Sequence, residues 1–90
     1  MQVTTELSLY PLSKDYESPI ISFIKHLKSH SEVQVNTHAM STFVKGNNSD
    51  VFNAISNSLE IVNKEIETVS LVIKVITRDL PVEKGFLNFS

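Results

Sequence analysis

The sequence predicts a small α+β domain whose elements follow the order βαββαβ. Short segments alternate apolar and polar residues as strands do, two longer segments repeat apolar residues at helical spacing, and turn-forming residues separate them. Joined in this order by right-handed crossovers, the strands form a four-stranded antiparallel sheet with both helices on one face, a ferredoxin-like arrangement. We expect the domain to span residues 1–79 and residues 80–90 to form a C-terminal tail.

The first strand and the first helix have clear signatures. Residues 3–10 alternate, with Leu7 and Leu9 on the side that should face the helices. A helix should span residues 18–29, because a serine at its start can cap free N–H groups and Pro19 suits the first helical position. One apolar stripe runs along this helix: Ile20, Phe23, Ile24 and Leu27.

The middle of the chain predicts a hairpin and a second helix. Residues 33–37 and 40–44 read as two short strands with a connection near residues 38–39. Turn residues follow at 46–48, and Ser49 with its neighbouring aspartate should cap the next helix. The apolar face of that helix has six members: Val51, Phe52, Ile55, Leu59, Val62 and Ile66.

Residues 68–77 are the most apolar strand. Their many β-branched side chains predict a strand packed on one face and partly covered on the other. Pro81 breaks the regular structure after it, and Phe86, Leu87 and Phe89 have no place in the predicted core. We expect this tail to become ordered only against a neighbouring chain or the rim of a ligand pocket.

Composition and charge exclude several classes of protein. Eight Lys and Arg against ten Asp and Glu give a net charge of −2, which disfavours nucleic-acid binding. The absence of Cys excludes disulfides and thiolate chemistry. The chain starts without a signal-peptide pattern and has no apolar run near the roughly 20 residues that span a bilayer. A cytoplasmic protein without membrane insertion is therefore expected.

Catalytic and metal-binding patterns are missing from the sequence. No phosphate loop, nucleophile elbow or acid–base–nucleophile grouping occurs, so we expect a protein that is not an enzyme and has no catalytic residues. His26 and His30 have the helical spacing that lets two imidazoles share a metal, yet no third ligand is placed beside them. The sequence therefore predicts no metal site and no cofactor.

The face of the sheet away from the helices carries the most informative residues. Alternation places Glu6, Ser8 and Tyr10 on that face, and the last strand adds Val72 and Ile76. A domain of this size gains stability from self-association. We expect a dimer or tetramer whose contacts include these apolar side chains.

Three segments of the sequence carry a family resemblance: Glu-Leu-Ser-Leu-Tyr-Pro-Leu at residues 6–12, Thr-His-Ala-Met-Ser-Thr-Phe-Val-Lys-Gly at residues 37–46, and Val-Ile-Lys-Val-Ile-Thr-Arg at residues 72–78. Together they resemble the thiamine-binding YkoF-like proteins and their short single-domain relatives. With both helices, the likeness covers residues 2–79. Because the YkoF protein itself has two fused domains, this single copy is expected to pair with itself.

The resemblance implies a domain that binds thiamine or its hydroxymethylpyrimidine moiety without transforming it, in vitamin uptake or salvage. The thiazolium of thiamine is a permanent cation suited to a carboxylate and an aromatic face, and the aminopyrimidine suits hydroxyl and amide groups. The candidate ligand-binding residues are Glu6, Ser8, Tyr10, Asn36, His38 and Thr42. Glu6 is expected to be the main acidic contact. The alternative is an ACT-like regulatory or structural homo-oligomer that binds another small metabolite or none.

Overall fold

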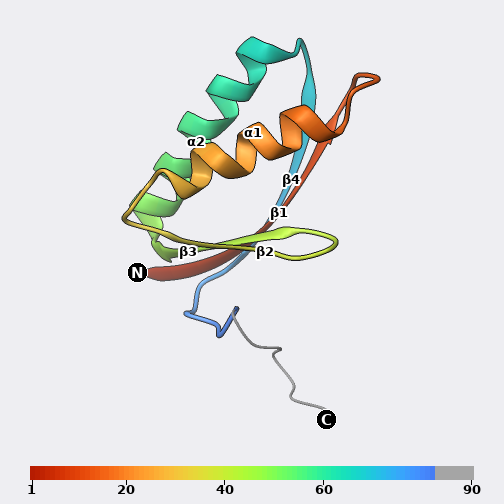
Figure 1. Cartoon of the computed structure of the whole chain (residues 1–90). Coiled ribbons are helices and arrows are strands. Elements are labelled where there is room, and N and C mark those ends of the chain that lie inside the picture. The colour runs from red at the N-terminus through yellow and green to blue at the C-terminus, as the bar shows by residue number, and fades with distance from the viewer. Residues whose placement is uncertain (83–90) are drawn as a thin grey trace.

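The computed structural model describes residues 1–82 and has the expected topology. The elements are β1 (Gln2–Pro11), α1 (Glu17–Lys28), β2 (Gln34–Thr37), β3 (Thr42–Asn47), α2 (Asn48–Glu65) and β4 (Val69–Ile76). The sheet is antiparallel with strand order β2-β3-β1-β4, and both helices cover one of its faces (Figure 1). The ferredoxin-like prediction is confirmed. We call the face away from the helices the open face.

The core lies between the two helices and the sheet. It consists of Val3, Leu7, Phe23, Leu27, Val44, Val51, Ala54, Ile55 and Val62. The predicted stripe of α1 is thus largely confirmed, since Phe23 and Leu27 are buried. Phe52 does not lie on the buried face of α2 as predicted. That face includes Ala54 and Ser58 instead, and the Phe52 ring is 38% exposed.

The start of α1 differs from the prediction. Tyr16 is the N-cap residue and makes no side-chain cap, whereas Asp15 Oδ1 accepts a hydrogen bond from the Ser18 N–H at 3.2 Å. Ser18 is therefore a donor in the first turn, and its hydroxyl and N–H hold the pKa of Asp15 below the ordinary value. Because the folded pKa is lowered, this contribution to stability is present above the ordinary pKa and is lost as the pH falls.

The start of α2 also differs. Asn47 is the N-cap residue, and its Oδ1 accepts from the Ser49 N–H at 3.1 Å, so Ser49 donates rather than caps. Gly46 and Asn47 end β3 instead of forming a separate turn. Gly46 has φ +154°, and an added Cβ would lie 3.2 Å from the Glu32 carbonyl oxygen, so glycine suits this junction.

The hairpin connection is longer than predicted. Residues 38–41 form it, closed by a hydrogen bond of 2.8 Å from the His38 N–H to the Ser41 carbonyl. β3 consequently pairs with β1 only as far as Leu7, whereas β4 pairs with β1 as far as Pro11. The last residues of β1 extend beyond β3, and this mismatch creates the candidate site.

Residues 78–82, which we call the 78–82 segment, fold back over the open face of the same chain (Figure 1). Thr4 Oγ1 donates to the Arg78 carbonyl at 2.7 Å and accepts from the Leu80 N–H at 3.0 Å. Lys45 Nζ lies 2.7 Å from the Leu80 carbonyl and 2.9 Å from Asp79 Oδ1. The first described residues of the predicted tail therefore contact the sheet of the same chain. The expected contacts of Phe86, Leu87 and Phe89 lie outside the described residues.

Ser58 gives a stability prediction. It is fully buried in α2, and its hydroxyl has no hydrogen-bond partner. Ser58→Ala should raise the free energy of unfolding by about 1 kcal/mol, because a buried hydroxyl without a partner is costly. Thermal unfolding should show a melting temperature that is higher by about 4 to 8 °C. Ser56→Ala, at an exposed position of the same helix, should change the melting temperature much less. A lower melting temperature for Ser58→Ala would mean that the hydroxyl has a partner.

Candidate ligand-binding site

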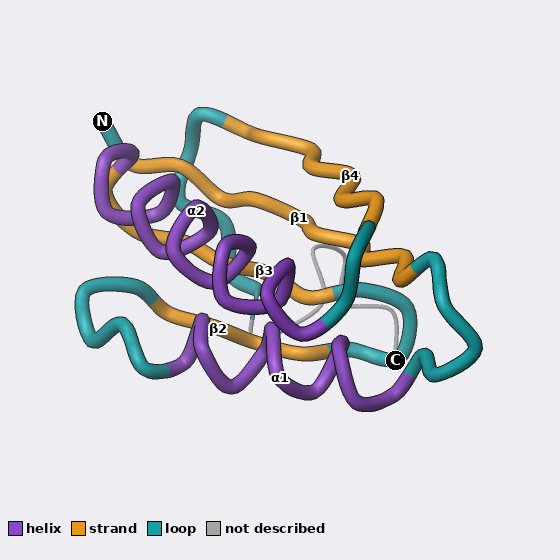
Figure 2. The backbone as a smooth tube through the Cα atoms, turned by 90° about the horizontal axis from the view of Figure 1, so that it is seen from above, coloured by secondary structure: helices purple, strands orange, loops and turns teal. Residues whose placement is uncertain are grey.

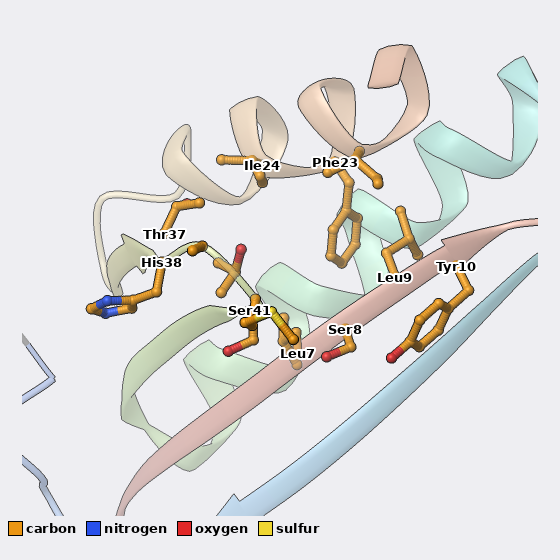
Figure 3. A pocket seen from close by; sticks show the side chains of 13 residues that line it. Leu7, Ser8, Leu9, Tyr10, Phe23, Ile24, Thr37, His38 and Ser41 are labelled. Carbon is orange, nitrogen blue, oxygen red and sulfur yellow. The ribbon is translucent and has the colours of Figure 1, made fainter. Parts of the chain in front are cut away.

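A pocket of about 170 Å³ lies at the end of β1 that extends beyond β3 (Figure 3). Three parts of the chain line it: residues 7–10 of β1, one side of α1, and residues 37–42 around the hairpin connection. The α1 side chains are Ile20, Phe23 and Ile24, which recur at helical spacing and so face the same direction.

The wall of the pocket next to the core is apolar. Leu9 on β1 and Phe23 on α1 point toward each other across it (Figure 3). Phe23 belongs to the buried core, so its ring is held in place. An engineered apolar cavity of about 150 Å³ in another protein binds benzene. The pocket described here therefore has the size of a single six-membered ring.

Hydrogen bonds at the two ends of β1 show which of its residues bond to β4 and which bond to β3. The Leu12 N–H donates to the Thr68 carbonyl at 3.2 Å on the β4 side, and the Asn48 N–H donates to the Met1 carbonyl at 2.9 Å on the β3 side. Successive residues of a strand direct their backbone groups to opposite edges. Even-numbered residues of β1 therefore bond toward β4, and odd-numbered residues bond toward β3.

Leu9 is the odd-numbered residue that follows the last pair between β1 and β3. Its register partner is in β4 only, since β3 pairing stops at Leu7. The Leu9 N–H and C=O are thus directed to the edge where the pocket lies. Pro11 is consistent with this assignment. It is odd-numbered and so faces the edge where β3 has ended, and its missing N–H removes no hydrogen bond between strands there. The pocket combines an apolar wall with one backbone donor and one backbone acceptor.

Four of the six predicted ligand-binding residues line the pocket: Ser8, Tyr10, His38 and Thr42. Thr42 does not lie beside Glu6 on the open face. Thr42 pairs with Leu7, so its side chain lies on the helix side and is buried, and Phe43 is the residue opposite Glu6. The sequence shows alternation within each strand, but the register between strands decides which residues share a face.

Glu6 lies on the open face, next to the pocket rather than in it. Glu6 Oε2 accepts a hydrogen bond of 3.1 Å from the hydroxyl of Ser41, which does line the pocket. Lys74 Nζ is 3.9 Å from Glu6 Oε1, and its side chain is 68% exposed. A pair this long and this exposed contributes little and can open. The carboxylate is therefore one hydrogen bond from the rim of the pocket and is accessible.

Asn36 and the His38 ring are placed away from the pocket interior. Asn36 lies opposite Phe43 on the open face, where its Oδ1 accepts from Gln34 Nε2 at 3.0 Å. The His38 ring makes an edge-to-face contact with Phe43, with 4.9 Å between centroids, and Figure 3 shows it directed away from the pocket. Asn36 is thus not brought together with the other candidates, and His38 contributes chiefly the backbone of the connection.

Sequence reasoning missed the apolar half of the pocket. Ile20, Phe23 and Ile24 were assigned only to the core, although the pocket uses the same stripe of α1. Ser41 was placed within a strand and not among the candidates. One signal could have revealed it. The two hairpin strands are shorter than β1, so part of the apolar stripe of α1 has no hairpin strand beneath it.

Other kinds of site receive no support within residues 1–82. This part of the chain contains no group of three or more His, Asp or Glu that could hold a metal ion. His30 Nδ1 lies 2.9 Å from the His26 carbonyl, so the two rings do not converge on a shared ligand position. Neither described helix is long and apolar enough to cross a membrane.

Fold and site together define a small ferredoxin-like domain with a ring-sized pocket between its first helix and the end of its first strand. The chain belongs to the YKOF-related family, whose model matches residues 2–77. This confirms the resemblance drawn from the sequence. No curated protein matches the chain.

Solved structures share the fold at low sequence identity. A hypothetical protein from Methanocaldococcus jannaschii superposes with a TM-score of 0.76 and 22% identity, over 87% of this chain and 81% of that chain. A structure described as a candidate thiamine biosynthesis or salvage protein from Thermotoga maritima has a TM-score of 0.76 and 14% identity, over 83% and 82% of the two chains. A domain of unknown function from Bacillus cereus has a TM-score of 0.72 and 23% identity, over 87% and 77%.

Proposed function

We propose that this protein binds thiamine, or the hydroxymethylpyrimidine moiety of thiamine, without transforming it. The observation that carries the proposal is the ring-sized apolar pocket, which lies one hydrogen bond from the carboxylate of Glu6. Membership of the YKOF-related family supports it, as does the fold shared with the Thermotoga maritima protein described in connection with thiamine biosynthesis or salvage. The setting that follows is vitamin uptake or salvage.

The pyrimidine ring fits the interior of the pocket. Leu9, Phe23 and Ile24 offer apolar contact to the faces and the methyl group of the ring. An aminopyrimidine carries an amino donor next to a ring-nitrogen acceptor, and the backbone C=O and N–H of Leu9 provide the complementary pair. A ligand held in this way pairs with the edge of β1 where β3 has ended.

The thiazolium ring lies outside the pocket in this proposal, because the pocket has room for only one ring. Ser8 and Ser41 form the rim on the side of Glu6. The permanent positive charge of the thiazolium would replace Lys74 beside that carboxylate, and the half-exposed Tyr10 offers an aromatic face. Bound thiamine would thus span the pocket and the adjoining part of the open face.

A binding role without catalysis is consistent with the lining of the pocket. Its titratable members among the described residues are Tyr10 and His38, and the His38 ring is directed away from the interior. No acid, base and nucleophile meet in that lining, and such a meeting is what hydrolysis or group transfer requires.

Calorimetric titration with thiamine and with hydroxymethylpyrimidine tests the proposal. Ile24→Trp should fill the pocket and abolish binding of both compounds, whereas Ile21→Trp, at a position 49% exposed on the same helix, should leave binding unchanged. Circular dichroism should show that both variants fold. If the wild-type protein binds neither compound, the proposal is wrong and the alternative of a regulatory or structural homo-oligomer is favoured.

The Glu6→Gln variant tests whether Glu6 binds the thiazolium part of thiamine and not the pyrimidine part. Charge-assisted hydrogen bonds contribute roughly 1.5 to 3 kcal/mol, so the dissociation constant for thiamine should rise about tenfold or more. The constant for hydroxymethylpyrimidine should not change, because that compound carries no thiazolium. An equal loss for both compounds would show that Glu6 acts by holding Ser41 and the rim rather than by binding the cation.

A further inference from the structure

Glu6 lies between an aromatic ring and an ammonium group on the open face. Its cross-strand partners are Phe43 of β3 and Lys74 of β4. Figure 2 shows β4 at the edge of the sheet, beside β1, and none of the described strands lies beyond it. The Lys74 side chain is 68% exposed. The cation beside this carboxylate is therefore free to move into solvent.

The contact between Glu6 and Lys74 is an ion pair without a hydrogen bond. Lys74 Nζ is 3.9 Å from Glu6 Oε1, whereas charge-assisted N–H···O bonds measure about 2.7 to 2.9 Å. The other oxygen, Oε2, accepts the hydrogen bond of 3.1 Å from the Ser41 hydroxyl. Oε1 can therefore exchange one cation for another while Oε2 keeps the carboxylate at the rim of the pocket.

The proposed binding of a thiazolium beside Glu6 leaves the Lys74 ammonium without its carboxylate. We propose, on the basis of that function, that Lys74 then binds a phosphate ester on the hydroxyethyl group of the thiazolium. A phosphate monoester carries a charge of about −1.5 to −2 at pH 7 and three acceptor oxygens. The positive and negative groups of such a ligand meet Glu6 and Lys74 respectively, so the site prefers thiamine monophosphate to thiamine.

The order of groups across the sheet matches the order of groups in this ligand. The pocket lies on the β3 side of β1, Glu6 is on β1 itself, and Lys74 is on β4. Pyrimidine, thiazolium and phosphate follow one another in the same sequence, and the thiazolium separates the phosphate from the carboxylate. Val72 is next to Lys74 on the open face and is 55% exposed, so it offers apolar contact to the two methylene groups that carry the phosphate.

Calorimetric titration with thiamine and with thiamine monophosphate tests the inference. The wild-type protein should bind the monophosphate about tenfold more tightly, because the ester adds charge-assisted hydrogen bonds. Lys74→Gln should raise the dissociation constant for the monophosphate about tenfold. The same variant should leave the constant for thiamine unchanged or slightly lower, since it removes the ammonium that competes for Glu6 and that pair is weak. Lys74→Arg should retain the preference.

Arg78→Gln is the matched control. It removes the same charge from an exposed residue past the end of β4, and it should leave both dissociation constants nearly unchanged. An equal loss of monophosphate affinity in Arg78→Gln and Lys74→Gln would overturn the inference, because the preference would then come from net charge and not from a contact.

Three further results separate this inference from the proposed function. A wild-type protein that binds thiamine at least as tightly as the monophosphate overturns the inference and leaves the proposed function intact. A Lys74→Gln variant that weakens both ligands equally also overturns it, in favour of a structural role for Lys74. Hydroxymethylpyrimidine carries neither charge, so it reports on the pocket alone. If the wild-type protein binds none of the three compounds, the proposed function and the inference are both wrong.

Discussion

Replacing Phe23 with Ala is expected to remove about half of the free energy of unfolding of this domain. The ring is 2% exposed and belongs both to the core and to the wall of the pocket. Substitutions of a buried Phe by Ala cost about 3 to 5 kcal/mol, because the transfer free energy of the ring is lost and a cavity remains. The free energy of unfolding of a domain of this size is about 5 to 10 kcal/mol in total. Urea unfolding monitored by circular dichroism should show this loss.

Phe52→Ala is the matched control, since its ring is 38% exposed on α2. It should change the free energy of unfolding by less than about 1 kcal/mol. Equal losses for the two variants would contradict the core described here. Phe23→Leu provides a second comparison, because it retains much of the volume and should fold while enlarging the pocket. Its affinity for hydroxymethylpyrimidine should fall if the Phe23 ring forms the binding wall.

Thr4→Val is expected to release the 78–82 segment from the sheet. Thr4 is 4% exposed, and its hydroxyl makes both hydrogen bonds that join β1 to the backbone of Arg78 and Leu80. Valine has the same shape and makes neither bond, so about 2 kcal/mol of unfolding free energy should be lost. The melting temperature should fall by about 8 °C or more.

Thr4→Ser retains the hydroxyl and should keep most of this stability. Lys45→Met removes a second set of contacts to the 78–82 segment. In the wild-type chain Lys45 Nζ donates to the Leu80 carbonyl and forms an ion pair with Asp79. If both residues hold one segment, the losses of Thr4→Val and Lys45→Met should be non-additive in a double-mutant cycle. Fully additive losses would show that the two anchors act separately.

The 78–82 segment limits what can approach the open face. It lies over Thr4 and Lys45, so the part near Glu6, Ser8 and Tyr10 is the accessible part. The pocket adjoins the accessible part, and Glu6 is within hydrogen-bond distance of its rim. A ligand that spans the pocket and the carboxylate therefore meets no obstacle from this segment.

The periodicity of the sequence was sufficient for the order of the elements and for most of the core. Leu7 and Phe23 are buried as their spacing predicts, because alternation and helical repeats depend only on neighbours along the chain. The helix caps were less predictable. Several polar residues precede each helix, and the backbone conformation decides which one accepts, as with Asp15 and Asn47.

The candidate site was predicted only in part, for a reason that Thr42 and Ser41 illustrate. Thr42 seemed equivalent to Ser8 as a hydroxyl on a strand, yet its pairing with Leu7 places it on the helix side. Ser41 lies in the connection because β3 begins one residue later. Both outcomes depend on pairing between segments that are more than thirty residues apart, which local patterns do not encode.

The sequence by itself determined the fold, the family and the alternation of side chains within each strand, since these follow from local periodicity and from the order of recognisable segments. Only the tertiary structure decided where strands stop and which edges stay free. The early end of β3 opens the pocket beside Leu9, and the position of β4 outside the helices leaves its edge unpaired. The physical reason is that each gap results from a difference in length or position between elements, and packing sets that difference only when the whole chain is folded.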